Sequence, residues 1–209
     1  VPGVPTIYER AMAATPAAAD TAASDAPADL GGVRYSISGA ASLPSRIIEP
    51  WEARTGGMLV EGYGLTETSP VLTINPLDDS RRAGTIGLPL PDTQLRIGDP
   101  HDLSRTQPDG EAGEILARGP QVFSGYLADA PATAAAFHDG WFRTGDMGVR
   151  DPDGHIRLVG RIKEIIITGG FNVYPGEVEE ALTSHPDIAQ AAVVGLSLIH
   201  ISEPTRPER

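Results

Sequence analysis

A strand–helix–strand order near the start of the chain restricts the fold more than any other feature. "VRYSISG", residues 33–39, alternates as a strand does and ends at glycine. "LPSRIIEPWEART", 43–55, predicts a helix, with Pro44 near its first turn and a glycine pair after its end. "MLVEGYG", 58–64, predicts a second strand. This order indicates a parallel α/β unit.

A parallel α/β unit binds ligands at the C-terminal ends of its strands. Gly39 and the segment Gly62–Glu67 fall at these ends. The sequence therefore predicts a ligand site there.

Composition excludes several functions. The net charge of −12 argues against a nucleic-acid or anionic-membrane surface, since both need basic patches. The absence of cysteine excludes disulfides and thiolate metal sites. Apolar runs are too short to span a membrane and no signal peptide is visible, so we expect a soluble cytoplasmic protein. Lys163 is the only lysine among 16 basic residues, which indicates a specific need for an ammonium group.

The middle of the chain changes to short β-like runs at 84–88, 93–97 and 113–118, which predict a small antiparallel barrel or sheet. A helix is expected over 131–137. Residues 141–161 predict a hairpin with "DPDG" as its turn.

The C-terminal part predicts further elements. "EIIIT", 164–168, is expected to be a buried strand that Gly169 and Gly170 end. A helix is expected from Pro175 to Leu182, and "IAQAAVVG", 188–195, predicts one more strand.

The first candidate cluster surrounds Tyr63. Flanked by Gly62 and Gly64, its ring can lie against a flat heterocycle, because no neighbouring side chain blocks its face. Thr66 offers a hydroxyl to a phosphate, and Glu67 offers a carboxylate suited to Mg²⁺. An ordinary turn at a strand end is the alternative.

Three further clusters carry polar or flexible residues. Asp146, at an expected strand end, either accepts from the two hydroxyls of a ribose or caps its own turn. Arg161 either contacts ribose or phosphate or forms a surface ion pair. Lys163 falls at a plausible joint between domains, and the pair Gly169–Gly170 either admits a ligand or forms a simple loop. The five histidines show no metal-ligand spacing.

The order of these clusters resembles one family. "SGAASLP", "EGYGLTETSP", "GWFRTGDMG" and "GRIKEIIITGGFNVYPGEVEEAL" follow one another as in the adenylate-forming superfamily of acyl-CoA synthetases, peptide-synthetase adenylation domains and luciferases. The resemblance covers roughly residues 1–195. Within the family, "GTIGLPLPDTQLRI" is most similar to bacterial long-chain fatty-acid–CoA ligases.

The resemblance implies an α/β fold. Residues 1–76 would be the α/β part of the large AMP-binding domain and 77–162 its β-barrel-like subdomain. Residues 163–195 would begin a small α+β C-terminal domain. The chain would then hold the C-terminal half of the large domain and the start of the small one.

The resemblance also implies residue roles on the nucleotide. Tyr63 would stack on the adenine of ATP, between Gly62 and Gly64. Asp146 would take the ribose hydroxyls, with Arg161 beside it. The adenine edge and the acyl pocket would be lined by Gly39, Ala40 and Ala41.

Catalysis is implied for Thr66, Glu67 and Lys163. Thr66 would contact the phosphates and Glu67 would hold Mg²⁺. Lys163 would be the hinge between the two domains. Gly169 and Gly170 would line the path of the pantetheine arm of coenzyme A.

The implied activity is that of an acid–thiol ligase. A carboxylic acid and ATP would form an acyl-adenylate, from which coenzyme A displaces AMP. The partners would be these small molecules, and no nucleic acid. The resemblance implies no particular oligomeric state. Two alternatives remain, an adenylation domain that loads an amino or aryl acid onto a carrier protein, and a non-catalytic nucleotide-binding module.

Two parts of the family pattern are missing from the chain. Neither its phosphate loop nor its C-terminal catalytic lysine is present, because Lys163 matches the hinge. We therefore expect a fragment that is inactive alone. "LSLIHISEPTR", within 196–209, resembles a translated sequencing adapter, so these residues are expected to be a non-biological tail.

Overall fold

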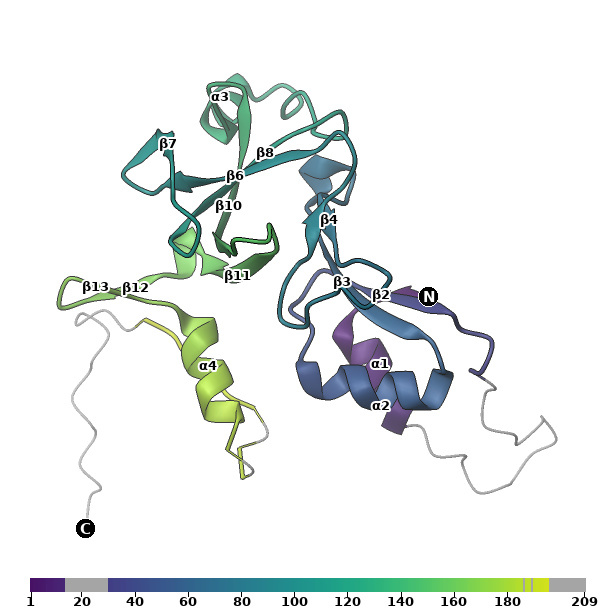
Figure 1. Ribbon diagram of the computed structural model, residues 1–209. Coiled ribbons are helices and arrows are strands. Elements are labelled where there is room, and N and C mark those ends of the chain that lie inside the picture. Colours follow the sequence, from purple (N-terminus) through teal and green to yellow (C-terminus); the bar gives the residue numbers. More distant parts are fainter. Residues whose placement is uncertain (14–29, 186, 189, 196–209) are drawn as a thin grey trace, which may run out of the picture.

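The computed structural model describes residues 1–13, 30–185, 187–188 and 190–195 (Figure 1). The predicted tail, 196–209, lies outside the described residues. A first, five-stranded sheet has the order β1-β2-β3-β4-β5. Its strands are β1 (Pro2–Gly3), β2 (Tyr35–Ser38), β3 (Met58–Tyr63), β4 (Thr73–Ile74) and β5 (Leu88–Pro89).

The expected parallel unit is confirmed, because β2 and β3 pair in parallel and α2 (Ser45–Thr55) connects them. The helix ends as its sequence predicts, with Gly56 in the left-handed region at φ 70°. At Gly57 a Cβ atom would overlap the carbonyl oxygen of Val33, so the return into β3 requires glycine there.

The core of this unit lies between the sheet and two helices, α1 (Pro5–Ala13) and α2, which lie side by side against one face (Figure 1). The Tyr8 and Trp51 rings meet edge to face at 4.8 Å. The Trp51 indole donates to the Ser36 hydroxyl at 3.0 Å, which satisfies its one polar group. The buried apolar residues are Tyr8, Leu43, Ile47, Trp51 and Leu59.

The second sheet is antiparallel and forms a nearly closed barrel, as expected. Its strands follow the order β11-β10-β8-β6-β7, and β9 pairs with β10. The expected helix is α3 (Ala130–Ala136). The strands are β6 (Gln94–Asp99), β7 (Asp102–Thr106), β8 (Ala112–Arg118), β9 (Phe137–His138), β10 (Trp141–Arg150) and β11 (Ile156–Arg161).

Two details of the expected barrel differ. The run at 84–88 supplies no barrel strand, because only Leu88 and Pro89 form a strand, and they pair with β4 in the first sheet. The strand β7 was not expected, because the segment "DLSRT" is mostly polar. In the structure four of its five residues are exposed. The hairpin of β10 and β11 is confirmed, and the Gly154 amide closes its turn on the Asp151 carbonyl at 2.9 Å.

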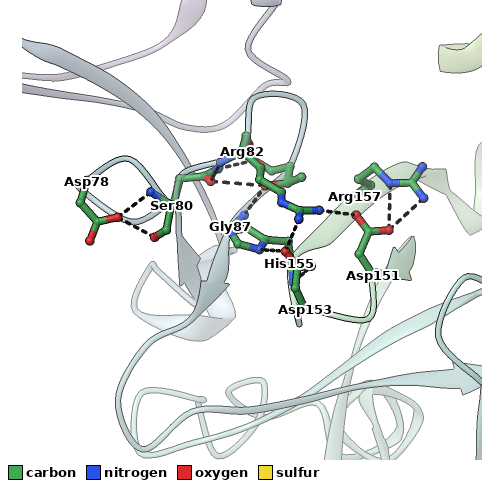
Figure 2. A network of polar contacts seen from close by, with 10 residues as sticks. Asp78, Ser80, Arg82, Gly87, Asp151, Asp153, His155 and Arg157 are labelled. Atoms are coloured by element: carbon green, nitrogen blue, oxygen red, sulfur yellow. Dashed lines mark hydrogen bonds and ion pairs between the residues drawn. The ribbon is translucent and has the colours of Figure 1, made fainter.

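This hairpin turn binds the loop that connects β4 and β5 of the first sheet (Figure 2). Arg82 of the loop pairs with Asp153 at 2.7 Å, and Asp153 also contacts Nδ1 of the buried His155 at 3.0 Å. Beside these side chains the Ile86 amide donates to the Ile156 carbonyl at 2.8 Å. Polar side chains and backbone together therefore hold the barrel against the α/β unit.

The C-terminal elements are a 3₁₀ turn η2 (Ile162–Glu164), a hairpin of β12 (Ile166–Thr168) and β13 (Phe171–Val173), and α4 (Pro175–Thr183). The strand expected at 164–168 is confirmed over Ile166–Thr168, but its expected burial is wrong, since Ile167 is 75% exposed on a two-stranded sheet. Residues 190–195 form no strand, contrary to expectation. The helix is confirmed from Pro175.

Candidate functional site

The glycine-rich segments meet at the C-terminal edge of β2 and β3, where the sequence predicts a ligand site. Ser38 pairs with Glu61, so the next residues along the two strands are Gly39 and Gly62. A Cβ atom at Gly39 would lie 3.6 Å from the carbonyl oxygen of Gly62. Ala40 follows with φ 65°, and it is exposed like Ala41.

Tyr63 connects this edge to the barrel. Its hydroxyl donates to Oδ2 of Asp146 at 2.7 Å. Its ring packs against both barrel clusters, one around Ile115 and one around Phe142. Burial, followed by the charge of Asp146, raises the pKa of Tyr63, which keeps the phenol a hydrogen-bond donor.

Asp146 lies within β10 and not at a strand end, which corrects the expected position. Its side chain does not cap its own turn. Instead it accepts from Tyr63 and pairs with Nε of Arg161 at 3.5 Å, directly across the β10–β11 ladder. Burial raises the pKa of Asp146, although Tyr63 and Arg161 both favour the carboxylate.

A buried Glu114 supports the backbone next to Asp146, and sequence reasoning missed it. Its carboxylate pairs with Arg143 at 2.9 Å and accepts from the amide of Gly145 at 3.2 Å. Gly145 has φ 73°, and β10 changes register here. Glu114 is the one charged residue in the otherwise apolar run "AGEILA", and this single carboxylate in an apolar strand was the available sequence signal.

The threonines of "TET" have different environments in η1 (Thr66–Thr68). Thr68 is fully buried, and its hydroxyl bonds to the backbone of Leu65 and Pro70. Thr66 is exposed. Gly64 must be glycine because a Cβ atom would overlap the Pro70 carbonyl oxygen, so the fold of the loop itself explains this residue.

Glu67 presents a half-buried carboxylate beside Thr66. Oε1 accepts from the Tyr126 hydroxyl at 2.9 Å, and no described residue donates to Oε2. Within the described residues no group of three or more acidic, His or Cys side chains could hold a metal. Such a site fits Mg²⁺ that brings its own phosphate and water ligands, because Mg²⁺ is commonly held by one or two carboxylates.

The remaining predicted residues follow β11 in the chain. Lys163 is exposed on η2, directly after Arg161 and Ile162. Gly169 and Gly170 form the two-residue turn of the β12–β13 hairpin, with φ of 58° and 84°. A turn with two positive φ angles favours glycine at both positions, which explains the pair structurally.

A mixed α/β sheet with an aromatic ring at the C-terminal edge of its parallel strands, joined to a small barrel that supplies a buried carboxylate, matches the enzyme domains of the adenylate-forming type. The sequence family described as "AMP-binding enzyme" matches residues 1–127. The chain therefore belongs to the AMP-binding enzyme family.

Individual relatives of this chain are CoA ligases. The chain is 43% identical to a long-chain-fatty-acid–CoA ligase of Yersinia pestis and 46% identical to an indoleacetate–CoA ligase of Aromatoleum aromaticum, with 80% of the chain covered in both cases. It spans only 30% and 32% of the length of these relatives. Among solved structures, ATP-bound MatB from Rhodopseudomonas palustris matches 92% of the chain and 37% of its own, with 37% identity and a TM-score of 0.79.

Among the described residues no helix has the length and apolar character that a membrane crossing requires.

Proposed function

We propose that the protein to which this chain belongs activates a carboxylic acid with ATP and transfers the acyl group to coenzyme A. The observation that carries the proposal is the bond between Tyr63 and Asp146, which lie 83 positions apart. It joins an aromatic side chain at the strand edge to a buried carboxylate on the barrel. An aromatic face and a carboxylate are the two groups that recognise adenine and a ribose diol.

On the nucleoside side, Tyr63 stacks on the adenine and Asp146 accepts from the ribose hydroxyls. Asp146 can bind both Tyr63 and a hydroxyl because a carboxylate has about four acceptor positions. The Arg161 guanidinium keeps positive charge beside it. The adenine edge and the acyl pocket are lined by Gly39, Ala40 and Ala41. Gly62 and Gly64 flank Tyr63 in the sequence.

On the phosphate side, the exposed Thr66 hydroxyl donates to a phosphate oxygen. Glu67 would hold Mg²⁺ through Oε2, the carboxylate oxygen to which no described residue donates. When bound, Mg²⁺ would neutralise phosphate charge. These groups position the reactants and stabilise developing negative charge, which is the main source of rate in phosphoryl-type transfer.

Two reactions follow in order. A carboxylate oxygen of the acid attacks the α-phosphorus of ATP, and pyrophosphate leaves. The sulfur of coenzyme A then attacks the acyl carbon, loses its proton, and AMP leaves with the electron pair.

We also propose that residues 1–76, 77–162 and 163–195 act as separate parts, with Lys163 as the hinge between the last two. The exposure of Lys163 on a single 3₁₀ turn supports this role, because such a turn can change its backbone angles freely. Gly169 and Gly170 then border the pantetheine arm.

For the acid, we propose a long-chain fatty acid, supported by the Yersinia pestis relative. The similar identity to an indoleacetate–CoA ligase favours an aryl acid as second candidate. ATP–pyrophosphate exchange by the full-length protein with a panel of both acid types tests the proposal. We expect pyrophosphate exchange only when the correct acid of the panel is present. The same acid should then form a thioester with coenzyme A.

Glu67→Ala in the full-length protein should abolish most of this exchange, whereas the exposed Glu111→Ala should not. Acyl transfer only to a carrier protein would instead identify an adenylation domain. Nucleotide binding without pyrophosphate exchange for any acid would indicate a non-catalytic nucleotide-binding module.

A further inference from the structure

A loop of the barrel attaches to Glu67 at two points. The Phe123 amide donates to the backbone oxygen of Glu67 at 2.8 Å. The Tyr126 hydroxyl donates to its carboxylate Oε1 at 2.9 Å, although the two residues lie 59 positions apart. Both the backbone and the side chain of Glu67 are therefore fixed from this loop.

The loop in turn holds the Tyr126 ring in place. The backbone amide of Tyr126 donates to the Thr133 hydroxyl at 2.9 Å. The Thr133 hydroxyl in turn donates to the carbonyl oxygen of Asp129, the N-cap residue of α3. The Tyr126 ring meets Phe123 edge to face at 4.9 Å. Phe123 packs on Phe142 of the barrel at 5.4 Å. The position of the phenol thus follows from the barrel core.

This contact leaves the two oxygens of Glu67 unequal. Oε1 is engaged by a phenol, while no described residue donates to Oε2. One carboxylate oxygen is therefore held by the barrel, and the other has no hydrogen-bond donor among the described residues.

We propose that Tyr126 is a positioning residue that orients the Glu67 carboxylate so that Oε2 faces the magnesium ion of the nucleotide. The inference rests on the proposed function of Glu67 and adds a residue of the barrel to the metal site. It also gives a structural reason for the barrel to lie against the α/β unit: it controls the direction of a carboxylate on η1.

The contact itself can be tested without any catalysis. Tyrosinate absorbance, taken as the difference between the protein and Tyr126→Phe, reports the ionisation of Tyr126 alone. Glu67→Gln should lower the pKa of Tyr126, because the negative acceptor is gone. An unchanged pKa would overturn the contact. Tyr35→Phe is the matched control, since Tyr35 is similarly exposed and its hydroxyl bonds to no described residue.

The role toward the metal is tested on the full-length protein with Mn²⁺ as probe, in the presence of ATP. Tyr126→Phe keeps the ring on Phe123 and removes only the hydroxyl. We expect Mn²⁺ affinity to fall roughly threefold to tenfold, as loss of one solvent-facing hydrogen bond implies. The half-saturating Mg²⁺ concentration in pyrophosphate exchange should rise by the same factor, with KM for the acid unchanged.

The outcomes separate three cases. Equal Mn²⁺ affinity in wild type and Tyr126→Phe refutes the positioning role. A lower melting temperature with all kinetic parameters reduced alike shows a purely structural role and also refutes it. If Glu67→Gln binds Mn²⁺ as well as wild type, the proposed role of Glu67 itself fails, independently of the Tyr126 titration.

Discussion

The Tyr63 hydroxyl donates a 2.7 Å hydrogen bond to Asp146, and in this way β3 of the α/β unit meets β10 of the barrel. The same carboxylate is paired with Arg161 on the neighbouring strand β11. Three strands from two sheets thus contribute to one polar contact. The nucleoside end of the proposed site consequently depends on how the barrel sits against the α/β unit.

Variants of this pair should have graded effects in the full-length protein. Asp146→Ala should lower ATP–pyrophosphate exchange by roughly 100-fold, since it removes a charged acceptor. Tyr63→Phe keeps the ring and should reduce exchange by roughly tenfold or less. Exchange rates of Asp146→Ala close to wild type would contradict the assignment of Asp146 to the ribose.

Gly64→Ala should destabilise the protein, because the new Cβ atom would overlap the Pro70 carbonyl oxygen. A loss of about 1–3 kcal/mol is expected for such overpacking. Thermal or urea unfolding measures it. Gly32→Ala, where no atom lies within 4 Å of the added group, is the control and should unfold as wild type does.

Glu61 should make stability depend on pH. Burial raises its pKa to about 7, and the Leu43 amide offsets this only in part. Because the folded state holds the proton more tightly than the unfolded chain, this contribution is full below a pH of about 4.5 and disappears as the pH rises through about 7.

Over that whole range the contribution of Glu61 corresponds to about 3 kcal/mol. Urea unfolding between pH 5 and 8 should show the fall in the wild type and a flatter profile in Glu61→Gln. The exposed Glu49→Gln should keep the wild-type slope. A wild-type slope in Glu61→Gln would mean that Glu61 titrates normally.

Lys163→Pro in the full-length protein should impair thioester formation more than adenylation. A hinge must change its backbone angles, and proline fixes φ and removes an amide donor. Lys163→Ala, which keeps this freedom, should separate the backbone effect from loss of the charge. Equal losses in both half-reactions of Lys163→Pro would argue against a hinge.

The origin of residues 196–209 is open to a direct test. If they derive from a sequencing adapter, independently prepared source DNA should not encode them after Gly195. Amplification and sequencing across this junction gives the answer. Recovery of the same codons would show that the segment belongs to the gene.

Local sequence was sufficient for the strand–helix–strand unit. The 33–63 region carries period-two runs, a helix stop at Gly56 and a return at Gly57, and each signal acts within a few residues. The β10–β11 hairpin was predictable for the same reason, because its "DPDG" turn is short-range. At 164–168 the apolar run predicted burial wrongly, because burial depends on packing against residues distant in the sequence.

The sequence by itself determined which chemical groups the site contains: the aromatic ring of Tyr63 between glycines, and the carboxylates of Glu67 and Asp146 in motifs of a recognisable order. Only the tertiary structure decided their partners. It separated Thr66 from the buried Thr68, placed Glu114 behind Gly145, and joined Tyr126 to Glu67. Hydrogen bonds require atoms within about 3 Å, and between residues 59 or 83 positions apart that proximity arises only when the two sheets pack.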